Sequence, residues 1–404
     1  LRAEDIRFKV NEVGKVVIGE KVQDTNTITM VDKPQEIELG KVDADDTSVY
    51  VAGAELEVRV ASGDTYTGKE KLATTILGDT LEWTSETTAT KFAGIRPGTY
   101  WLVETAAPSG YTLAQPVKFT VEAGEESSGT VQIVTIADKQ TEVVLTKRFE
   151  SATKEEIAGM LQDLALKVVS ADGSYTHEIT EDEKKLIADG VTVTLKGLPA
   201  GEYYLVETKA PAGFTIADQI SFNVTEKQEQ VIVPAMTDTS VKVKISKLDI
   251  DTNQFIEGAE FEIHEKTGEN AYADAVAVNA YGEKLKFVSG TSEAVLTGVK
   301  PGNYYIVETK APEGYKKLKA PVELTIGENL TVSVGTVSKT IYNSPLEVAL
   351  AKADAKTGKA LAGAKLELHI AAGDSEKGFE AGTLISEKFQ WISTETAKTF
   401  ERLT

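Results

Sequence analysis

The chain has 404 residues, with 43 Lys plus Arg against 63 Asp plus Glu, which gives a formal net charge of -20 and argues against nucleic acid as a partner. Its composition, 41% hydrophobic and 26% charged, is that of a folded protein, and no run of apolar residues is long enough to span a membrane. There is no cysteine, and His177, His264 and His369 are too far apart in sequence for metal-ligand spacing, so disulfides, thiol chemistry, metals and cofactors are not expected.

The first segment, residues 1–36, is predicted to hold the closing strands of a β-rich repeat whose earlier strands lie upstream. Alternation in this segment places Ile28, Met30 and Asp32 on one face of a strand. The chain starts at Leu1, and neither a signal peptide nor a sorting tail is visible, so we expect a fragment in which Asp32 has no reaction partner.

Three near copies of about 100 residues follow. Their clearest marks are TYWLVETAAPSGYTL from Thr99, EYYLVETKAPAGFTI from Glu202 and NYYIVETKAPEGYKKL from Asn303. A strand-like run ending in lysine opens each copy, and a strand ending in Asp or Asn closes it. These landmarks predict repeats at 37–141, 142–239 and 240–344, with the opening half of a further repeat at 345–404.

Within the repeats the predicted elements are short strands rich in Val, Ile, Thr and Tyr, separated by Gly and Pro turns. Short helices are expected only in the second repeat, around Lys154 to Gln162 and Glu181 to Ile187. The pattern predicts an all-β chain built as a tandem array of Ig-like β-sandwich domains.

Strand periodicity places three recurring polar residues on apolar faces. In VKVKISK, Lys247 shares a face with Val241, Val243 and Ile245, and Lys41, Lys147 and Lys352 follow the same phase. The glutamates of the VET strings and the closing Asp or Asn residues are also in phase with apolar neighbours. Each complete repeat therefore directs a lysine, a glutamate and an Asp or Asn towards its core.

Burial of such groups leaves two interpretations open. The first is a buried ion pair completed by hydrogen bonds, because a lone buried charge costs several kcal/mol. The second is chemical: a desolvated lysine loses its proton and becomes a nucleophile, and a neighbouring protonated glutamate polarises the carbonyl of an acid or amide. Attack would then give an intramolecular isopeptide bond.

The repeated YxVETxAPxGY string, together with AGAE-like runs such as VAGAELEV from Val51, resembles the Cna B-type, or SpaA-type prealbumin-like, domains of Gram-positive pilins and surface adhesins. The resemblance implies a transthyretin-like sandwich whose first and last strands are joined by an autocatalytic isopeptide bond, assisted by the glutamate. The triads it implies are Lys41, Glu104 and Asp138; Lys147, Glu207 and Asp238; and Lys247, Glu308 and Asn343. The acceptors Asp138 and Asp238 depart from the family's usual asparagine. Lys352 has no partners in the fragment and should stay unreacted.

The resemblance also implies the biological setting. We expect a structural stalk on a bacterial surface, extracellular and joined to the cell wall by sortase in the full-length protein. The alternative is an adhesin that binds host extracellular matrix or another cell, for which the long stretch from Glu265 to Gly290 is the best candidate. An enzyme is not expected, because each triad would consume itself once.

One further pattern concerns metals. DIDTNQFIEGAE from Asp249 places acidic residues at several calcium-loop positions, but Gln254 stands where the loop requires Gly and the flanks are strands. We therefore interpret it as a turn, and predict no metal site.

Overall fold

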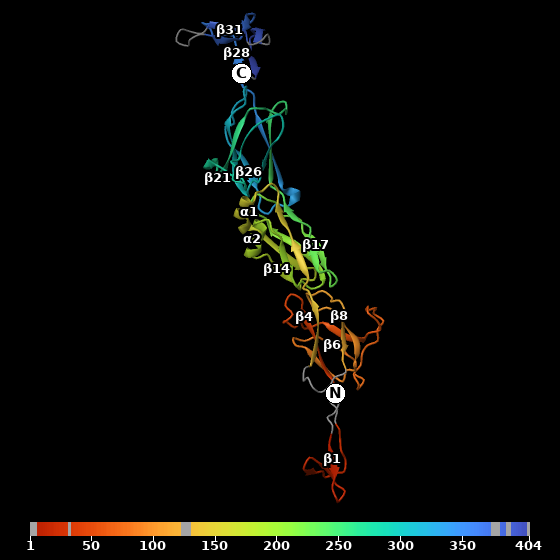
Figure 1. Cartoon of the computed structure of the whole chain (residues 1–404). Helices are drawn as coiled ribbons and strands as arrows, with labels where there is room; N and C mark the ends of the chain where they lie inside the picture. Colours follow the sequence, from red (N-terminus) through yellow and green to blue (C-terminus); the bar gives the residue numbers. More distant parts are fainter. Residues whose placement is uncertain (1–5, 31–33, 123–130, 373–379, 385–388, 402–404) are drawn as a thin grey trace. The chain divides into compact units, whose positions relative to one another are not determined.

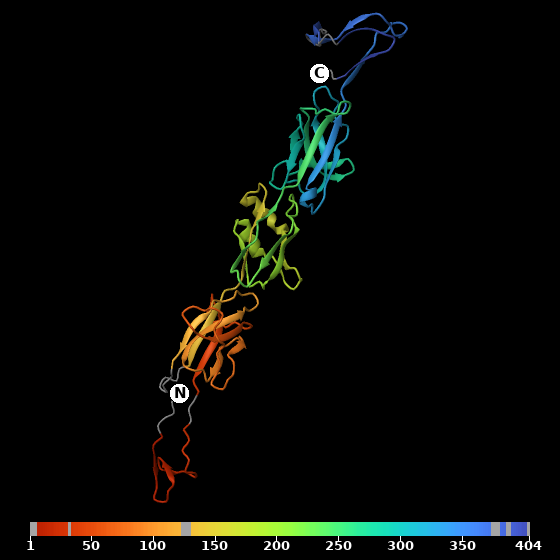
Figure 2. The same ribbon diagram turned by 90° about the vertical axis from the view of Figure 1, so that its right-hand side faces the viewer.

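The computed structural model describes residues 6–30, 34–122, 131–372, 380–384 and 389–401. Two compact units are distinguished: one comprises 1–147, 167–206 and 219–236, and the other 148–166, 207–218 and 237–404. The second repeat therefore contributes to both. Strands dominate the chain (Figures 1 and 2), and the prediction of an all-β fold is confirmed.

The N-terminal segment forms a small antiparallel sheet in the order β1-β2-β3. Its strands are β1 (Phe8–Val10), β2 (Val16–Ile18) and β3 (Lys21–Val22). The predicted core-facing strand at Ile28 to Asp32 is wrong in its described part: residues 28–30 form no strand, and Met30 is 57% exposed. Among the described residues of this segment, no strand is paired with residues 28–30, and alternation alone does not bury a face. Asp32 itself lies outside the described residues.

The first repeat packs two sheets face to face, with strand orders β10-β4-β7 and β6-β5-β8-β9. The strands are β4 (Glu36–Asp43), β5 (Glu55–Val60), β6 (Glu82–Thr84), β7 (Thr90–Ala93), β8 (Gly98–Ala106), β9 (Val117–Val121) and β10 (Gln132–Asp138). The first and last strands, β4 and β10, are parallel neighbours. Its core includes Ile37 and Leu39 from one sheet and Val58 and Leu102 from the other.

The second repeat has sheets in the orders β15-β11-β18, β12-β19 and β14-β13-β16-β17. The strands are β11 (Glu142–Leu145), β12 (Lys147–Phe149), β13 (Ala165–Ser170), β14 (Thr176–Glu178), β15 (Val193–Lys196), β16 (Gly201–Lys209), β17 (Ile220–Val224), β18 (Gln230–Ile232) and β19 (Met236–Asp238). Unlike β4, the lysine strand is divided here into β11 and β12.

The two helices predicted for this repeat are confirmed as α1 (Lys154–Met160), extended by the 3-10 turn η1 (Leu161–Asp163), and α2 (Glu181–Ala188). Both begin with a capping box, in which Thr153 pairs with Glu156 and Thr180 with Glu183. Because each box satisfies backbone donors at the helix start, short helices can form between strands.

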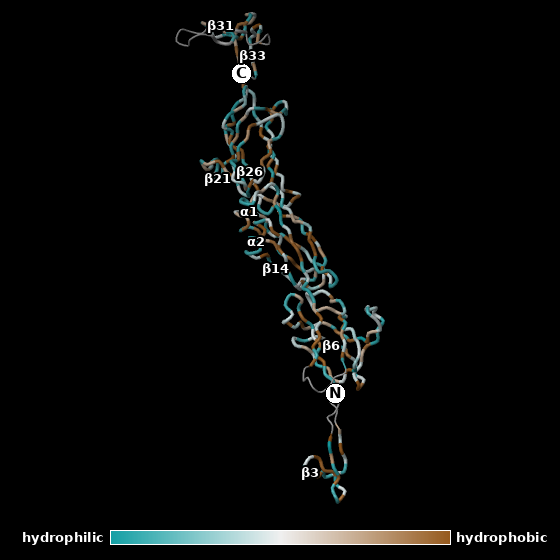
Figure 3. Tube along the Cα trace, in the orientation of Figure 1, coloured by the Kyte–Doolittle hydropathy of each residue, from teal (hydrophilic) through white to brown (hydrophobic). Residues whose placement is uncertain are grey.

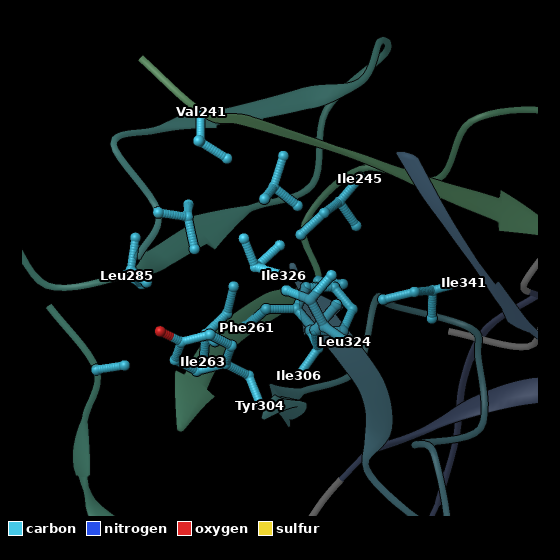
Figure 4. Packing of buried hydrophobic residues seen from close by; sticks show 14 residues of the cluster. Val241, Ile245, Phe261, Ile263, Leu285, Tyr304, Ile306, Leu324, Ile326 and Ile341 are labelled. Carbon is cyan, nitrogen blue, oxygen red and sulfur yellow. The ribbon is translucent and has the colours of Figure 1, made fainter. Parts of the chain in front are cut away.

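The third repeat returns to the plan of the first, with sheets in the orders β24-β20-β27 and β22-β21-β25-β26, and β23 also paired with β21. The elements are β20 (Lys242–Asp249), β21 (Glu260–Gly268), β22 (Ala271–Val276), β23 (Lys286–Val288), β24 (Ala294–Thr297), β25 (Gly302–Lys310), β26 (Val322–Ile326), the 3-10 turn η2 (Val332–Val334) and β27 (Thr336–Asn343). Figure 4 shows the core between the sheets, where Ile245 and Ile341 lie with Phe261, Ile306 and Leu324.

The apolar faces follow the predicted period of two. Along β20 every second residue is buried, from Val243 through Ile245 and Lys247 to Asp249. The tube in Figure 3 shows the resulting mixture of apolar and hydrophilic residues along the strands. The phase that was predicted for the lysines of the three complete repeats is therefore confirmed, since Lys41 and Lys147 are buried as well.

The last segment forms three two-stranded pairs, β28 with β33, β29 with β32 and β30 with β31. Their bounds are β28 (Glu347–Leu350), β29 (Lys365–Glu367), β30 (His369–Ala372), β31 (Glu380–Leu384), β32 (Gln390–Ile392) and β33 (Lys398–Glu401). The predicted core-facing position of Lys352 is wrong: it lies beyond β28 and is exposed. Residues 345–404 contain no VET string to supply a strand over it.

Candidate functional site

In the first repeat the three predicted polar residues meet inside the sandwich. The Lys41 ammonium forms an ion pair with Oδ1 of Asp138 and lies 3.0 Å from Oε1 of Glu104. The exposed fractions of Lys41, Glu104 and Asp138 are 0%, 4% and 1%. A lysine and two carboxyl groups are thus held together away from water.

Strand register explains why Lys41 and Asp138 meet. In the parallel pair, Lys41 of β4 is opposite Ile136 of β10, and Asp138 follows two residues later on the same face. Glu104 reaches the pair from β8 in the facing sheet, where Leu102 and Glu104 are both buried. The site therefore joins the first strand, the last strand and the opposite sheet of one repeat.

The third repeat builds the same site with an amide. Lys247 donates a hydrogen bond to Oδ1 of Asn343, and Nδ2 of Asn343 donates to Oε1 of Glu308 at 2.8 Å. The Lys247 ammonium is 3.8 Å from the same Glu308 oxygen. The ring of Phe261 covers the lysine, with 5.7 Å from Nζ to the ring centroid.

In the second repeat the three predicted residues are also buried, with exposed fractions of 8% for Lys147, 5% for Glu207 and 0% for Asp238. Lys147 opens β12 and Asp238 closes β19, the two strands of one sheet, while Glu207 lies near the end of β16. The residue types match the first repeat, and in all three repeats the lysine and the acceptor lie on the first and last strands.

Each glutamate is fixed by a backbone contact that sequence analysis missed. Oε2 of Glu104, Glu207 and Glu308 accepts a hydrogen bond of 2.7 Å from the backbone N–H of Ala114, Ala217 and Leu318, respectively. The donor is ten residues after the glutamate in all three repeats, but a backbone N–H leaves no side-chain signal from which sequence analysis could have found it. The contact leaves the other oxygen, Oε1, directed at the lysine and its partner in the first and third repeats.

Burial shifts the pKa of Asp138 in the first repeat and of Lys247 in the third repeat towards the uncharged form that amide formation requires. Desolvation raises the pKa of Asp138 to about 7, although Lys41 opposes this shift. Desolvation likewise lowers the pKa of Lys247 to about 8, against the opposing effect of Glu308. In the third repeat the lowered pKa favours the neutral amine of Lys247 beside the uncharged amide of Asn343, and only the neutral amine is a nucleophile.

The calcium-like stretch from Asp249 is a turn. Oδ1 of Asp249 accepts hydrogen bonds from the backbone N–H groups of Asp251 and Thr252, which is the pattern of an aspartate-stabilised turn. Within the part of the chain that the structure describes, no group of three or more His, Asp or Glu side chains could hold a metal ion. Of the helices formed by the described residues, none has the length and apolar character needed to cross a bilayer.

The three repeats match a known protein family. A family model described as SpaA, prealbumin-like fold domain, matches residues 35–140, 142–239 and 241–340. Among curated proteins, tenascin-N of Mus musculus is 23% identical over 253 residues, which is 61% of this chain and 14% of that protein.

Several solved structures match the chain at low similarity. The Bacillus anthracis TIE protein matches with 20% identity and a TM-score of 0.36, over 81% of this chain and 55% of that chain. BcpA, the major pilin subunit of Bacillus cereus, matches with 16% identity and a TM-score of 0.30, over 78% of this chain and 100% of that chain. The full-length major pilin SpaD from Corynebacterium diphtheriae has 14% identity and a TM-score of 0.34, over 77% of this chain and 97% of that chain. The chain thus spans less than two thirds of tenascin-N and of the TIE protein.

Proposed function

Because the three family matches cover more than half of its residues, the chain belongs to the SpaA prealbumin-like fold family, and we propose that it is a load-bearing stalk of a bacterial surface protein. In this proposal each complete repeat is closed by an isopeptide bond between its first and last strands. The observation that carries the proposal is the buried Lys, Glu and Asp or Asn cluster, which recurs on corresponding strands.

The chemistry is clearest in the third repeat. Neutral Lys247 attacks Cγ of Asn343 through Nζ, while the carboxyl group of Glu308, whose Oε1 lies 2.8 Å from Nδ2, transfers a proton to the leaving nitrogen. A bond forms between Nζ and Cγ, the bond from Cγ to Nδ2 breaks, and ammonia leaves. The proton that the lysine nitrogen loses restores the acid form of Glu308, so no other reactant is needed.

In the first two repeats the acceptor is a carboxyl group, and the leaving group is water. Lys41 forms the bond to Cγ of Asp138, and Lys147 forms it to Cγ of Asp238, as one bond from Cγ to a carboxyl oxygen breaks. The raised pKa of Asp138 supports this reaction, because an ionised carboxylate is a poor acceptor. Every site reacts once, so this is maturation rather than turnover catalysis.

The position of the bond suits mechanical load. Force enters the first repeat at the start of β4 and leaves it after the end of β10, and these strands are parallel. Without a crosslink this force shears the hydrogen bonds between them. With a bond from Lys41 to Asp138, force passes through the bond, and the residues between them carry no tension. The bond also replaces the chain closure that disulfides provide in other secreted domains.

The setting of the stalk is part of the same proposal. We assign repeat boundaries at 37–141, 142–239 and 240–344, an extracellular location, and attachment to the Gram-positive cell wall through sortase in the full-length protein. The location is supported by the resemblance of the repeated YxVETxAPxGY string to domains of Gram-positive pilins and surface adhesins, and the family match to the same three repeats agrees with it.

An adhesive role is the second candidate. It is supported by the stretch after β21 in the third repeat, where β22 is added at the edge of the sheet and carries Tyr272, which is 38% exposed. Tyr272 lies against His264 and Tyr305, with ring centroids 5.0 and 6.3 Å apart. If this surface binds host matrix, beads coated with the chain should adhere to immobilised fibronectin or collagen, and Tyr272→Ala should reduce adhesion. Equal adhesion of the two proteins would exclude this surface.

The crosslinks themselves are tested by digesting the purified chain and sequencing its peptides by mass spectrometry. The proposal predicts three branched peptides, joining Lys41 to Asp138, Lys147 to Asp238 and Lys247 to Asn343. Glu308→Ala should remove the third and leave the other two. Recovery of unbranched peptides that contain all six residues would refute the mechanism.

A further inference from the structure

A tyrosine hydrogen-bonded to a buried aspartate lies beside two of the sites and has no role in the bond-forming step. In the first repeat Oη of Tyr111 donates a hydrogen bond of 2.9 Å to Oδ2 of Asp43. In the third repeat Oη of Tyr315 donates to Oδ2 of Asp249 at 2.8 Å. The two aspartates are 8% and 2% exposed, so each carboxylate depends on partners inside the protein.

The pair adjoins the reacting groups through strand register. Asp43 is opposite Asp138 in the parallel pair of β4 and β10, and Asp249 is opposite Asn343 in the pair of β20 and β27. Each aspartate also follows the lysine of its strand by two residues, on the same buried face. The tyrosine is therefore tied to the lysine strand next to the acceptor.

The loop that carries the tyrosine has two further attachments. The residue after it pairs with the closing strand: the N–H of Thr112 donates to the carbonyl of Lys139, and the N–H of Lys316 to the carbonyl of Ser344, both at 2.9 Å. Three residues after the tyrosine, Ala114 or Leu318 donates its N–H to the site glutamate. One short loop thus contacts the lysine strand, the acceptor strand and the glutamate.

The second repeat keeps this arrangement and changes both members of the pair together. Phe149 stands two residues after Lys147, and Phe214 occupies the tyrosine position, with ring centroids 5.5 Å apart. The N–H of Thr215 still donates to the carbonyl of Thr239, and Ala217 still donates to Glu207. A polar pair and an apolar pair therefore occupy the same place, which is expected if the contact holds the loop rather than taking part in chemistry.

This inference rests on the proposed crosslinking. We propose that one pair of side chains in each repeat holds the loop that aligns the site glutamate. These positioning pairs are Tyr111 with Asp43, Tyr315 with Asp249 and Phe214 with Phe149. Loss of the pair leaves the lysine and the acceptor in place but lets the loop, and with it the glutamate carboxyl, depart from the reactive geometry. Misplacement of a reacting group by about 1 Å lowers a rate by as much as roughly a hundredfold.

The test compares two tyrosine hydroxyls of the same repeat. Tyr111→Phe removes the contact with Asp43, whereas the control Tyr100→Phe removes a hydroxyl that donates to the carbonyl of Arg96 at 2.7 Å, away from the loop. Both variants of the full chain are made by cell-free synthesis and sampled over time. Molecules that resist trypsin under native conditions are selected, so that only folded protein is counted, and the branched peptide joining Lys41 to Asp138 is quantified.

We expect Tyr111→Phe to slow this crosslink roughly ten- to a hundredfold, with Tyr100→Phe close to the unmodified chain. The crosslinks of the other two repeats serve as internal standards and should be unchanged. Tyr315→Phe, with Tyr304→Phe as its control, repeats the test in the third repeat if the first variant does not fold. Equal rates for Tyr111→Phe and Tyr100→Phe would overturn the positioning role alone. Absence of every crosslink from the unmodified chain would overturn the proposed function and this inference together.

Discussion

Glu104→Gln should make the first repeat extensible under force. Glutamine can still accept the hydrogen bond from Ala114 but cannot supply the acid that assists attack on Asp138, so the fold should be retained and the bond lost. Force would then shear β4 from β10 and release the chain between Lys41 and Asp138. That stretch is roughly 100 residues long, and its full extension amounts to roughly 330 Å.

Single-molecule pulling from the two ends of the chain measures this directly. The unmodified chain should show no such step from any of its three complete repeats, and Glu104→Gln should show one. Glu57→Gln is the matched control, because Glu57 is a buried glutamate of the same repeat that pairs with Arg59 outside the site. The reasoning is refuted if the unmodified chain yields steps of this length from its repeats, or if Glu104→Gln yields none.

Three further predictions concern the sites individually. The third crosslink should form faster as pH rises towards about 8, the lowered pKa of Lys247, because deprotonation supplies the nucleophile. The first crosslink should form more slowly above about pH 7, the raised pKa of Asp138, because the acceptor ionises. A time course of the branched peptides from pH 6 to 9 compares the rates of the two crosslinks. If both rates changed with pH in the same way, these assignments would be contradicted. Asp138→Asn should still crosslink but lose ammonia instead of water, so its mass deficit should be about 1 Da smaller, whereas an uncrosslinked product would show that the site requires a carboxyl group. In the Glu308→Gln variant the third repeat should unfold at a temperature at least about 20 °C lower, because a crosslink that closes a loop of roughly 100 residues contributes about 5 kcal/mol to the free energy of unfolding. Calorimetry measures this transition, and an unchanged unfolding temperature would contradict the prediction.

The sequence allowed the complete repeats and their polar core positions to be predicted because strand periodicity is a local property. The burial of Lys247 with Val243 and Ile245 follows from alternation alone. The same reasoning was wrong for Met30 and Lys352, which are exposed. Alternation defines a face of a strand, but only a covering sheet buries that face.

The parts of the site that escaped prediction depend on contacts between loops and strands. The backbone N–H of Ala114 carries no side-chain signal, and its contact with Glu104 arises from how the loop folds back. The pairing of Tyr111 with Asp43 joins residues 68 positions apart. Comparison of the three repeats could have suggested it, since aspartate and tyrosine are both replaced by phenylalanine in the second.

The central claim is that the buried triads form covalent bonds, and the intact mass of the chain under denaturing conditions tests it most directly. Each Asp acceptor should remove about 18 Da and the Asn acceptor about 17 Da, a deficit of roughly 53 Da for three bonds. A loss of only about 17 Da would confine the chemistry to Lys247 and Asn343. A mass equal to that of the unmodified sequence would contradict the account and leave the triads as buried ion pairs and hydrogen bonds.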